Sequence, residues 1–192
     1  VSGDTNNWRD IFVRDRQTGV TERVSVSTVE AEGNGDSDEP SVSADGRYVA
    51  FSSIATNLVS DDTNGVSDIF VRDRQTGVTE RVSVSSVGVQ GDGVSDEPSI
   101  SGDGRYVAFR SMATNLVTGD TNGVPDIFVH DRQSGQTERV SVSSGGVQGD
   151  GFSNRPVISA DGRYVAFSSV ATNLVDGDTN GVSDIFVHDR QT

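Results

Sequence analysis

The chain has 192 residues, 15 basic and 29 acidic side chains, and a formal net charge of −14. This length fits one compact domain. Because nucleic-acid binding depends on basic side chains that displace counterions from phosphates, the acidic balance argues against a nucleic-acid partner. No apolar run approaches the roughly 20 residues of a membrane-spanning helix, so we expect no membrane insertion. The lack of cysteine excludes disulfides and thiol chemistry.

Valine dominates the apolar residues, with 30 Val against 3 Leu. β-Branched side chains lose rotamer freedom in a helix but pack well on the pleated surface of a sheet. The composition therefore predicts an all-β protein and argues against a mostly helical one.

One repeat runs through the whole chain at a constant spacing of 58 positions. The string DGRYVAF recurs at this spacing, and so does the string DIFV, which begins at Asp10, Asp68, Asp126 and Asp184. Three periods are complete and a fourth is partial. Self-similarity at a fixed period is the sequence signature of repeat architectures, in which each copy forms one supersecondary unit.

Each period contains four strand signals, which in the second copy lie at residues 97–101, 105–111, 126–131 and 137–143. The first two are joined by an Asp-Gly turn and the last two by a tight turn ending in Gly, both typical of hairpins. The middle strands are continuous apolar runs, which suit strands buried on both faces. These features predict four-stranded antiparallel blades of a β-propeller, with about three blades' worth of sequence.

Two motifs carry a resemblance to a known family. One is S-x-D-G-R-Y-V-A-F-x-S, and the other is D-I-F-V-x-D-x-x-(T/S)-G-x-T-E-R-V-S. Together they resemble the TolB-type β-propeller repeat, and the resemblance covers nearly the whole chain. The family usually has Pro before the Asp-Gly, where this chain has Ala44, Gly102 and Ala160. The resemblance implies a propeller of the kind that occurs in periplasmic envelope complexes and beside peptidase domains.

The blades divide the chain into a partial blade at 1–29, complete blades at 39–85 and 97–143, and an incomplete blade at 155–192. Propellers typically have four to eight blades. We therefore expect the chain to belong to a longer array or to be completed by neighbouring chains, and the longer array is the favoured interpretation. Exposed strand edges at an open end would invite self-association.

A loop before each DIFV strand carries the pattern Asp-x-Asn-x-x-x-Asp. Calcium takes six to eight oxygen ligands, and alternate residues of a tight loop can direct several such oxygens at one point. We predict calcium sites here, with an extra carboxylate in the last copy. The side-chain ligands would be Asp4, Asn6, Asp10, Asp62, Asn64, Asp68, Asp120, Asn122, Asp126, Asp176, Asp178, Asn180 and Asp184. The alternative is that Asp and Asn cap turns by bonding to their own backbone.

A second acidic loop carries Asp-Glu pairs in two copies and Asn154-Arg155 in the third. It is either a second metal site or a solvated loop between blades. We predict no catalytic residues. The carboxylates recur in each repeat, whereas an active site is normally unique. His130 and His188 stand where other copies have Arg, so we expect both to be exposed. The serines of the RVSVS strand, which we expect to form the hydroxylated face of an outer strand, accompany no nucleophile motif.

These observations predict a non-enzymatic, calcium-stabilised scaffold for protein interaction, adhesion or filament assembly, located outside the cell, at its surface or in the periplasm. The partners would be other proteins or further copies of the chain. The alternative is a recognition or gating module of a larger secreted or periplasmic hydrolase or envelope complex.

Overall fold

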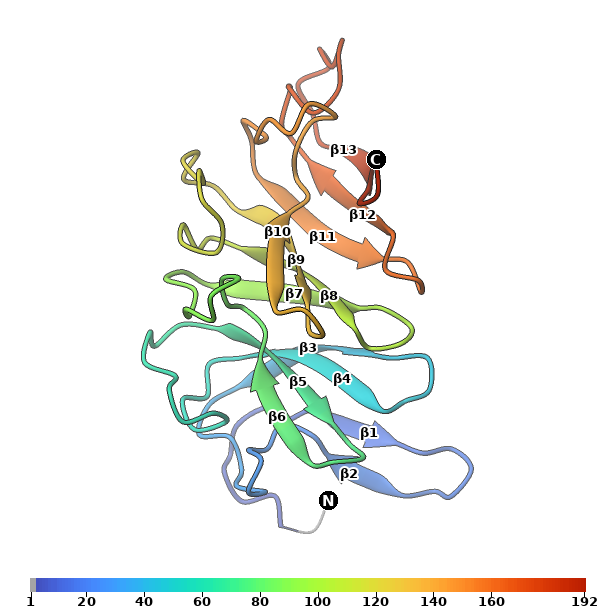
Figure 1. The fold of residues 1–192 in the computed structure, drawn as a ribbon. Coiled ribbons are helices and arrows are strands. Elements are labelled where there is room, and N and C mark those ends of the chain that lie inside the picture. The colour runs from blue at the N-terminus through green and yellow to red at the C-terminus, as the bar shows by residue number, and fades with distance from the viewer. Residues whose placement is uncertain (1–2) are drawn as a thin grey trace.

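The computed structural model describes residues 3–192, so the first two residues of the predicted partial blade at 1–29 lie outside the description. All secondary-structure elements of the described residues are strands, which pair into four antiparallel sheets, so the predicted all-β class with four-stranded units is confirmed. The sheets follow one another from the N-terminal end to the C-terminal end of the chain (Figure 1). No helix in the described part is long and apolar enough to cross a bilayer.

Two of the sheets are complete and have four strands each, in sequence order from one edge to the other. The first consists of β3 (Ser37–Val42), β4 (Tyr48–Ser53), β5 (Asp68–Asp73) and β6 (Val78–Arg81). The second consists of β7 (Ser95–Ile100), β8 (Tyr106–Ser111), β9 (Asp126–Asp131) and β10 (Gln136–Arg139). We call these sheets blade II and blade III.

The sheets at the two ends of the chain have fewer strands. The first, blade I, pairs β1 (Phe12–Arg14) with β2 (Thr21–Arg23). The last, blade IV, contains β11 (Ser153–Ile158), β12 (Tyr164–Ser169) and β13 (Asp184–Asp189). In the repeat, β1 and β13 are third strands, and β2 is a fourth strand. Each fourth strand is shorter than predicted, since the ladder of the expected strand at 137–143 ends at Arg139.

The core lies between successive sheets. Ile69 and Val71 of blade II pack in one cluster with Val107 and Phe109 of blade III. All six residues of β5 and all six of β9 are buried. The continuous apolar runs are therefore covered on both faces, as the sequence predicts, and a single blade has no core of its own.

The first strands of successive blades lie beside each other and share a repeated bond. Ile100 N donates to Ser41 Oγ at 3.1 Å, and Ile158 N donates to Ser99 Oγ at the same distance. A second bond runs from Glu97 N to Glu39 Oε2 at 2.7 Å. A register shift interrupts each first strand at this point, and the residue before the proline there has a positive φ, between 53° and 55° in the three copies.

Blades II and III each place a tyrosine on a glycine of the following blade. An added Cβ on Gly104 would lie 2.1 Å from the ring of Tyr48, so only glycine fits there. Arg132 covers the same ring, with its guanidinium carbon 4.4 Å from the ring centroid. The next pair of blades repeats the arrangement with Tyr106 on Gly162. We call this contact the Tyr–Gly seat.

The two arginines that lie over the Tyr48 ring also form ion pairs. Arg47 stacks on Tyr48 and binds Asp73 with Nε and Nη2, at 2.9 and 2.6 Å. This pair holds the pKa of Asp73 well below its usual range. Arg132 donates through Nε to Glu80 of the preceding blade at 2.6 Å. Aromatic, ionic and backbone contacts therefore fix each blade on its neighbour.

Gly104→Ala tests the Tyr–Gly seat. Gly104 has a φ of +74° and Tyr48 against it, whereas Gly123 has a φ of +69° and nothing within 4 Å. We expect Gly104→Ala to lower the free energy of unfolding by about 2–4 kcal/mol, through the left-handed backbone and the overpacking together. The control Gly123→Ala loses only the backbone contribution of about 1 kcal/mol. Urea melts measure both, and equal losses would contradict the seat.

Candidate functional site

The predicted metal loops lie at the end of the sheets where β4 leads into β5 and β6 leads toward β7. In the second copy, Asn64 Oδ1 accepts from Val66 N at 3.1 Å, which is an Asx turn. Its amide nitrogen donates to Asp68 Oδ2 at 3.0 Å and to the carbonyl of Gly91 at 2.9 Å. Asn64 thus closes the loop and ties it to the loop that leads into the next blade.

Asp68 is fully buried at the start of β5. Its Oδ1 accepts from Ser83 Oγ at 2.5 Å, and Ser83 Oγ accepts from Ile69 N at 3.1 Å. The hydroxyl of this outer-strand serine is therefore not in contact with solvent, because Ser83 is also buried. The serine is needed inside because it relays a backbone N–H to a buried carboxylate that would otherwise be under-bonded.

Arg81 supplies the positive charge beside the two carboxylates. Its Nη1 lies 3.7 Å from Asp62 Oδ1 and 3.9 Å from Asp68 Oδ2, and all three side chains are at most 5% exposed. Gln90 Nε2 bridges the same two carboxylates, at 2.9 and 3.0 Å. Burial raises the pKa of Asp62, and the nearby charge of Asp68 adds to this effect. We call this set the arginine network.

The third copy repeats the arginine network closely. Arg139 Nη1 lies 3.5 Å from Asp120 Oδ1 and 3.6 Å from Asp126 Oδ2, and Gln148 bridges both carboxylates. Asn122 donates to Asp126 at 3.1 Å. Burial again raises the pKa of Asp120.

The first copy substitutes a glutamate for the bridging glutamine. Arg23 Nη1 lies 3.2 Å from Asp10 and 3.5 Å from Asp4, and Nη2 binds Glu32. Asn6 donates to Asp10 at 3.2 Å, as in the other copies. Three carboxylates therefore surround one guanidinium here.

The fourth loop differs because none of the described arginines reaches it. Asn180 donates to Asp184 Oδ2 at 2.6 Å and accepts from Val182 N at 2.9 Å, so its turn is formed. Asp176 is exposed, as is most of this loop, which borders a hollow of about 400 Å³.

These contacts favour the turn-capping alternative over a calcium shell. Each Asn directs its oxygen at a backbone N–H and its nitrogen at the Asp, and in three copies a guanidinium stands beside the carboxylates. Within the described residues, no group of three or more His, Asp or Glu side chains is arranged to hold a metal ion. Calcium binding therefore stays a prediction, and the donor set as folded does not fit it.

The arginine was not predicted from the sequence, because it lies far beyond the loop, inside the strand motif T-E-R-V-S. The signal was present, since every T-E-R-V-S follows an Asp-x-Asn-x-x-x-Asp loop at the same distance. Adjacent antiparallel strands place residues far apart in sequence directly opposite one another. The pairing of Phe70 with Arg81 brings the arginine to the base of the loop.

The second acidic loop is also bonded within the protein. Asp92 accepts from Thr114 N and Oγ1, at 2.7 and 2.8 Å. Asp96 pairs with Arg110 at 2.7 Å, and Asp38 pairs with Arg9 at 2.8 Å. These contacts support the non-metal interpretation of this loop.

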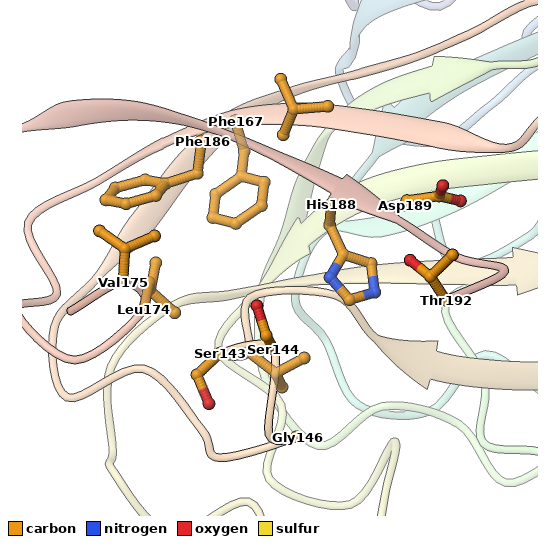
Figure 2. Close-up of a pocket in the computed structure, with 12 residues that line it drawn as sticks. Ser143, Ser144, Gly146, Phe167, Leu174, Val175, Phe186, His188, Asp189 and Thr192 are labelled. Carbon is orange, nitrogen blue, oxygen red and sulfur yellow. The ribbon is translucent and has the colours of Figure 1, made fainter.

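The two histidines occupy less exposed positions than the sequence predicts. His130 is buried in β9, with Nδ1 2.8 Å from Thr137 Oγ1, and burial lowers its pKa. His188 is half-buried in β13, and its pKa is lowered for the same reason. His188 borders a groove of about 500 Å³ together with Ser144 and Phe186 (Figure 2). Among the described contacts, no carboxylate is hydrogen-bonded to either ring.

Comparison with solved structures identifies similar folds. No protein-family model matches the chain, and no curated protein matches it. TolB from Acinetobacter baumannii is similar at a TM-score of 0.55 and 23% identity, over 95% of this chain and 36% of that one. A putative TolB from Agrobacterium tumefaciens is similar at a TM-score of 0.58 and 21% identity, over 94% of this chain and 53% of that one.

The tricorn protease is a further similar structure, at a TM-score of 0.54 and 17% identity, over 95% of this chain and 15% of that one. The chain thus spans only part of each of these proteins, and about half or less of the two TolB chains. At these identities the comparisons establish the fold, which is that of a TolB-type β-propeller repeat.

Arg81→Gln tests the arginine network. Removing the guanidinium leaves two buried carboxylates without their counter-charge, so we expect the free energy of unfolding to fall by about 3 kcal/mol. Arg16→Gln is the control, because Arg16 is exposed and makes no ion pair with any described residue. Urea melts at neutral pH compare the two, and an Arg81→Gln variant as stable as the control would contradict the network.

The same melts with and without EGTA examine the calcium prediction. The arginine network predicts one melting curve under both conditions, because the carboxylates already have an internal cation. A ligand that binds only the folded state stabilises it by mass action. A melting temperature that falls on chelation and recovers with calcium would therefore support the predicted calcium sites and contradict the turn-capping interpretation.

Proposed function

We propose that the chain is a non-catalytic β-propeller scaffold that binds protein partners. The observation that carries the proposal is that the loop carboxylates are engaged in bonds within the protein itself. In the first three copies, most carboxylates of the long loops bond to arginine, asparagine, threonine or backbone groups of their own fold. Catalysis needs a group free to act on a substrate, and such groups are usually unique in a repeat.

The long-loop end of the sheets offers a surface for a partner. Ile54, Met112 and Phe152 belong to three successive blades and are 47%, 49% and 43% exposed. Each lies where a second strand ends or a first strand begins, beside the acidic loops. A partner with apolar and basic side chains would complement this surface in both hydrophobicity and charge.

In this proposal the protein acts outside the cell, at its surface or in the periplasm. If chelation lowers its melting temperature, the scaffold is also stabilised by calcium. The net charge of −14 and the absence of cysteine are compatible with each of these locations.

A second candidate is a recognition or gating module within a larger hydrolase. It is favoured by the similarity to the tricorn protease and to prolyl endopeptidases, the latter at a TM-score of 0.53 over 94% of this chain and 24% of that one. In that setting the same long-loop end would contact a substrate or a neighbouring domain.

Two designed peptides test the scaffold proposal. We expect an Arg-Leu repeat peptide to bind and a Glu-Leu repeat peptide not to bind, as measured by fluorescence anisotropy. The variant Ile54→Ser/Met112→Ser/Phe152→Ser should weaken binding about tenfold or more. Val20→Ser/Val78→Ser is the control, since these exposed residues lie at the hairpin end.

Equal binding of the two peptides, or an unchanged affinity of the triple variant, would contradict the proposed surface. Turnover of chromogenic peptide or ester substrates by the purified chain would contradict the non-catalytic role.

A further inference from the structure

The fourth strands of blades II and III, β6 and β10, each lie at an edge of their sheet. In an antiparallel pair, successive residues direct their backbone groups alternately toward the partner strand and away from it. Val140 N donates inward to the carbonyl of Ile127 at 2.8 Å, so the backbone groups of Thr137, Arg139 and Ser141 face outward. Such a row of outward N–H and carbonyl groups is a template on which another strand can pair.

An apolar hollow lies beside this edge. It has a volume of about 600 Å³ and is lined by Thr137 of β10 together with Val87, Val89, Leu116 and Val117. An equivalent hollow of about 630 Å³ borders β6 one repeat earlier. Proteins that bind an extended peptide at a sheet edge use backbone bonds for affinity and pockets for its alternate side chains. The outer edge of each blade therefore has both parts of a strand-addition site.

The hydroxyl of Ser86, in the loop after β6, occupies the edge of β10. Ser86 Oγ accepts from Thr137 N at 2.9 Å and donates to the carbonyl of Thr137 at 3.2 Å. One side chain thus uses both outward backbone groups of Thr137. Thr137 Oγ1 donates in turn to the carbonyl of Val84 at 2.6 Å, and Thr137 is buried. We call this set of bonds the hydroxyl clasp.

The edge of β6 carries the same clasp, with threonine in place of serine. Thr28 Oγ1 accepts from Thr79 N at 3.1 Å and donates to the carbonyl of Thr79 at 3.4 Å. Thr79 Oγ1 donates to the carbonyl of Val26 at 2.6 Å. The two copies share only the hydroxyl at this position, so the hydroxyl is the group that the clasp requires.

The chain itself also covers the far end of each outward row. Gly149 N donates to the carbonyl of Ser141 at 3.1 Å, and Gly91 N donates to the carbonyl of Ser83 at 3.0 Å. Between the clasp and this bond, each row has one outward position left, which belongs to the arginine of the arginine network. Among the described residues, no hydrogen bond covers the backbone of that arginine. A single open position cannot support a ladder, so the clasp decides whether the edge is available.

We propose that the hydroxyl clasp holds a latent strand-addition site closed on the outer edge of blade II and of blade III. An incoming strand would have to displace the hydroxyl before its backbone could pair with Thr79 or Thr137. With the clasp in place, the sheets do not extend at these edges, either with a second copy of the chain or with another protein. This inference goes beyond the proposed scaffold function, which concerns the long-loop end, and either can fail without the other.

Hydrogen exchange at single amides, measured by NMR, tests the clasp. Thr28→Ala/Ser86→Ala removes both hydroxyls, and because both residues are exposed, we expect the fold to persist. We expect the amides of Thr79 and Thr137 to exchange about tenfold faster in this variant, since each loses one hydrogen bond. Val82 is the internal reference, because its amide donates to the carbonyl of Ile69 within the sheet.

The matched control is Thr28→Ser/Ser86→Thr, which exchanges the two residues and keeps both hydroxyls. We expect its Thr79 and Thr137 amides to exchange at the rate of the unmodified chain. Equal rates in the alanine variant and the control would overturn the clasp. Equal acceleration of the Val82 amide in the alanine variant would overturn it too, because the hydroxyls would then hold the whole sheet and not its edge.

A labelled peptide of alternating Thr and Val tests whether the opened edge accepts a strand. Its backbone can pair with the edge while its valines enter the hollow. By fluorescence anisotropy, we expect the alanine variant to bind it at least about tenfold more tightly than the unmodified chain or the control does. The same peptide with alternate backbone nitrogens methylated cannot donate to the edge, and we expect it not to bind.

The peptide results decide the strand-addition site separately from the clasp. The site is wrong if the alanine variant shows the faster exchange but does not bind the peptide. Equal affinity of the unmodified chain and the alanine variant would show that the hydroxyl closes nothing. Equal binding of the methylated peptide would show that the hollow alone binds it, without backbone pairing, and would also overturn the proposal.

Discussion

The structure depends on the contact between successive sheets. The middle strands of a blade are buried on both faces, so a blade alone would expose apolar side chains to water. The Tyr–Gly seat fixes how two blades meet, because the ring of Tyr48 fills the space where any side chain on residue 104 would stand. Arg47 of blade II and Arg132 of blade III both lie over the ring, and each binds a carboxylate of blade II. Stability is therefore a property of neighbouring pairs.

Arginine is the cation of this fold at every position, since all 15 basic residues are arginine. A planar guanidinium can stack on a ring and bind a carboxylate with two nitrogens at once, which lysine cannot do. Arg47 uses both abilities, and Arg81 serves the buried carboxylates of the loop. In a chain with an excess of acidic residues and no cysteine, arginine thereby supplies the counter-charge of the buried carboxylates.

Much of the fold follows from the sequence, because the repeat multiplies each local signal. Strand order, hairpin positions and the doubly buried strands at residues 68–73 and 126–131 agree with the structure. The candidate site was harder to predict, because an Asp-x-Asn pattern serves equally as a metal loop or a turn cap. The deciding residue, Arg81, comes from a strand whose position beside the loop is fixed only by pairing. The burial of Ser83 and His130 had the same origin, since both face a neighbouring segment that sequence alone does not place.

The coupling between Tyr48 and Arg132 tests the central claim most directly. The two residues belong to adjacent blades, and the guanidinium lies over the ring. A double-mutant cycle with Tyr48→Leu, Arg132→Leu and the double variant isolates their interaction in the free energy of unfolding. The account predicts a favourable coupling of about 1–2 kcal/mol. Additive losses, with a coupling near zero, would contradict it.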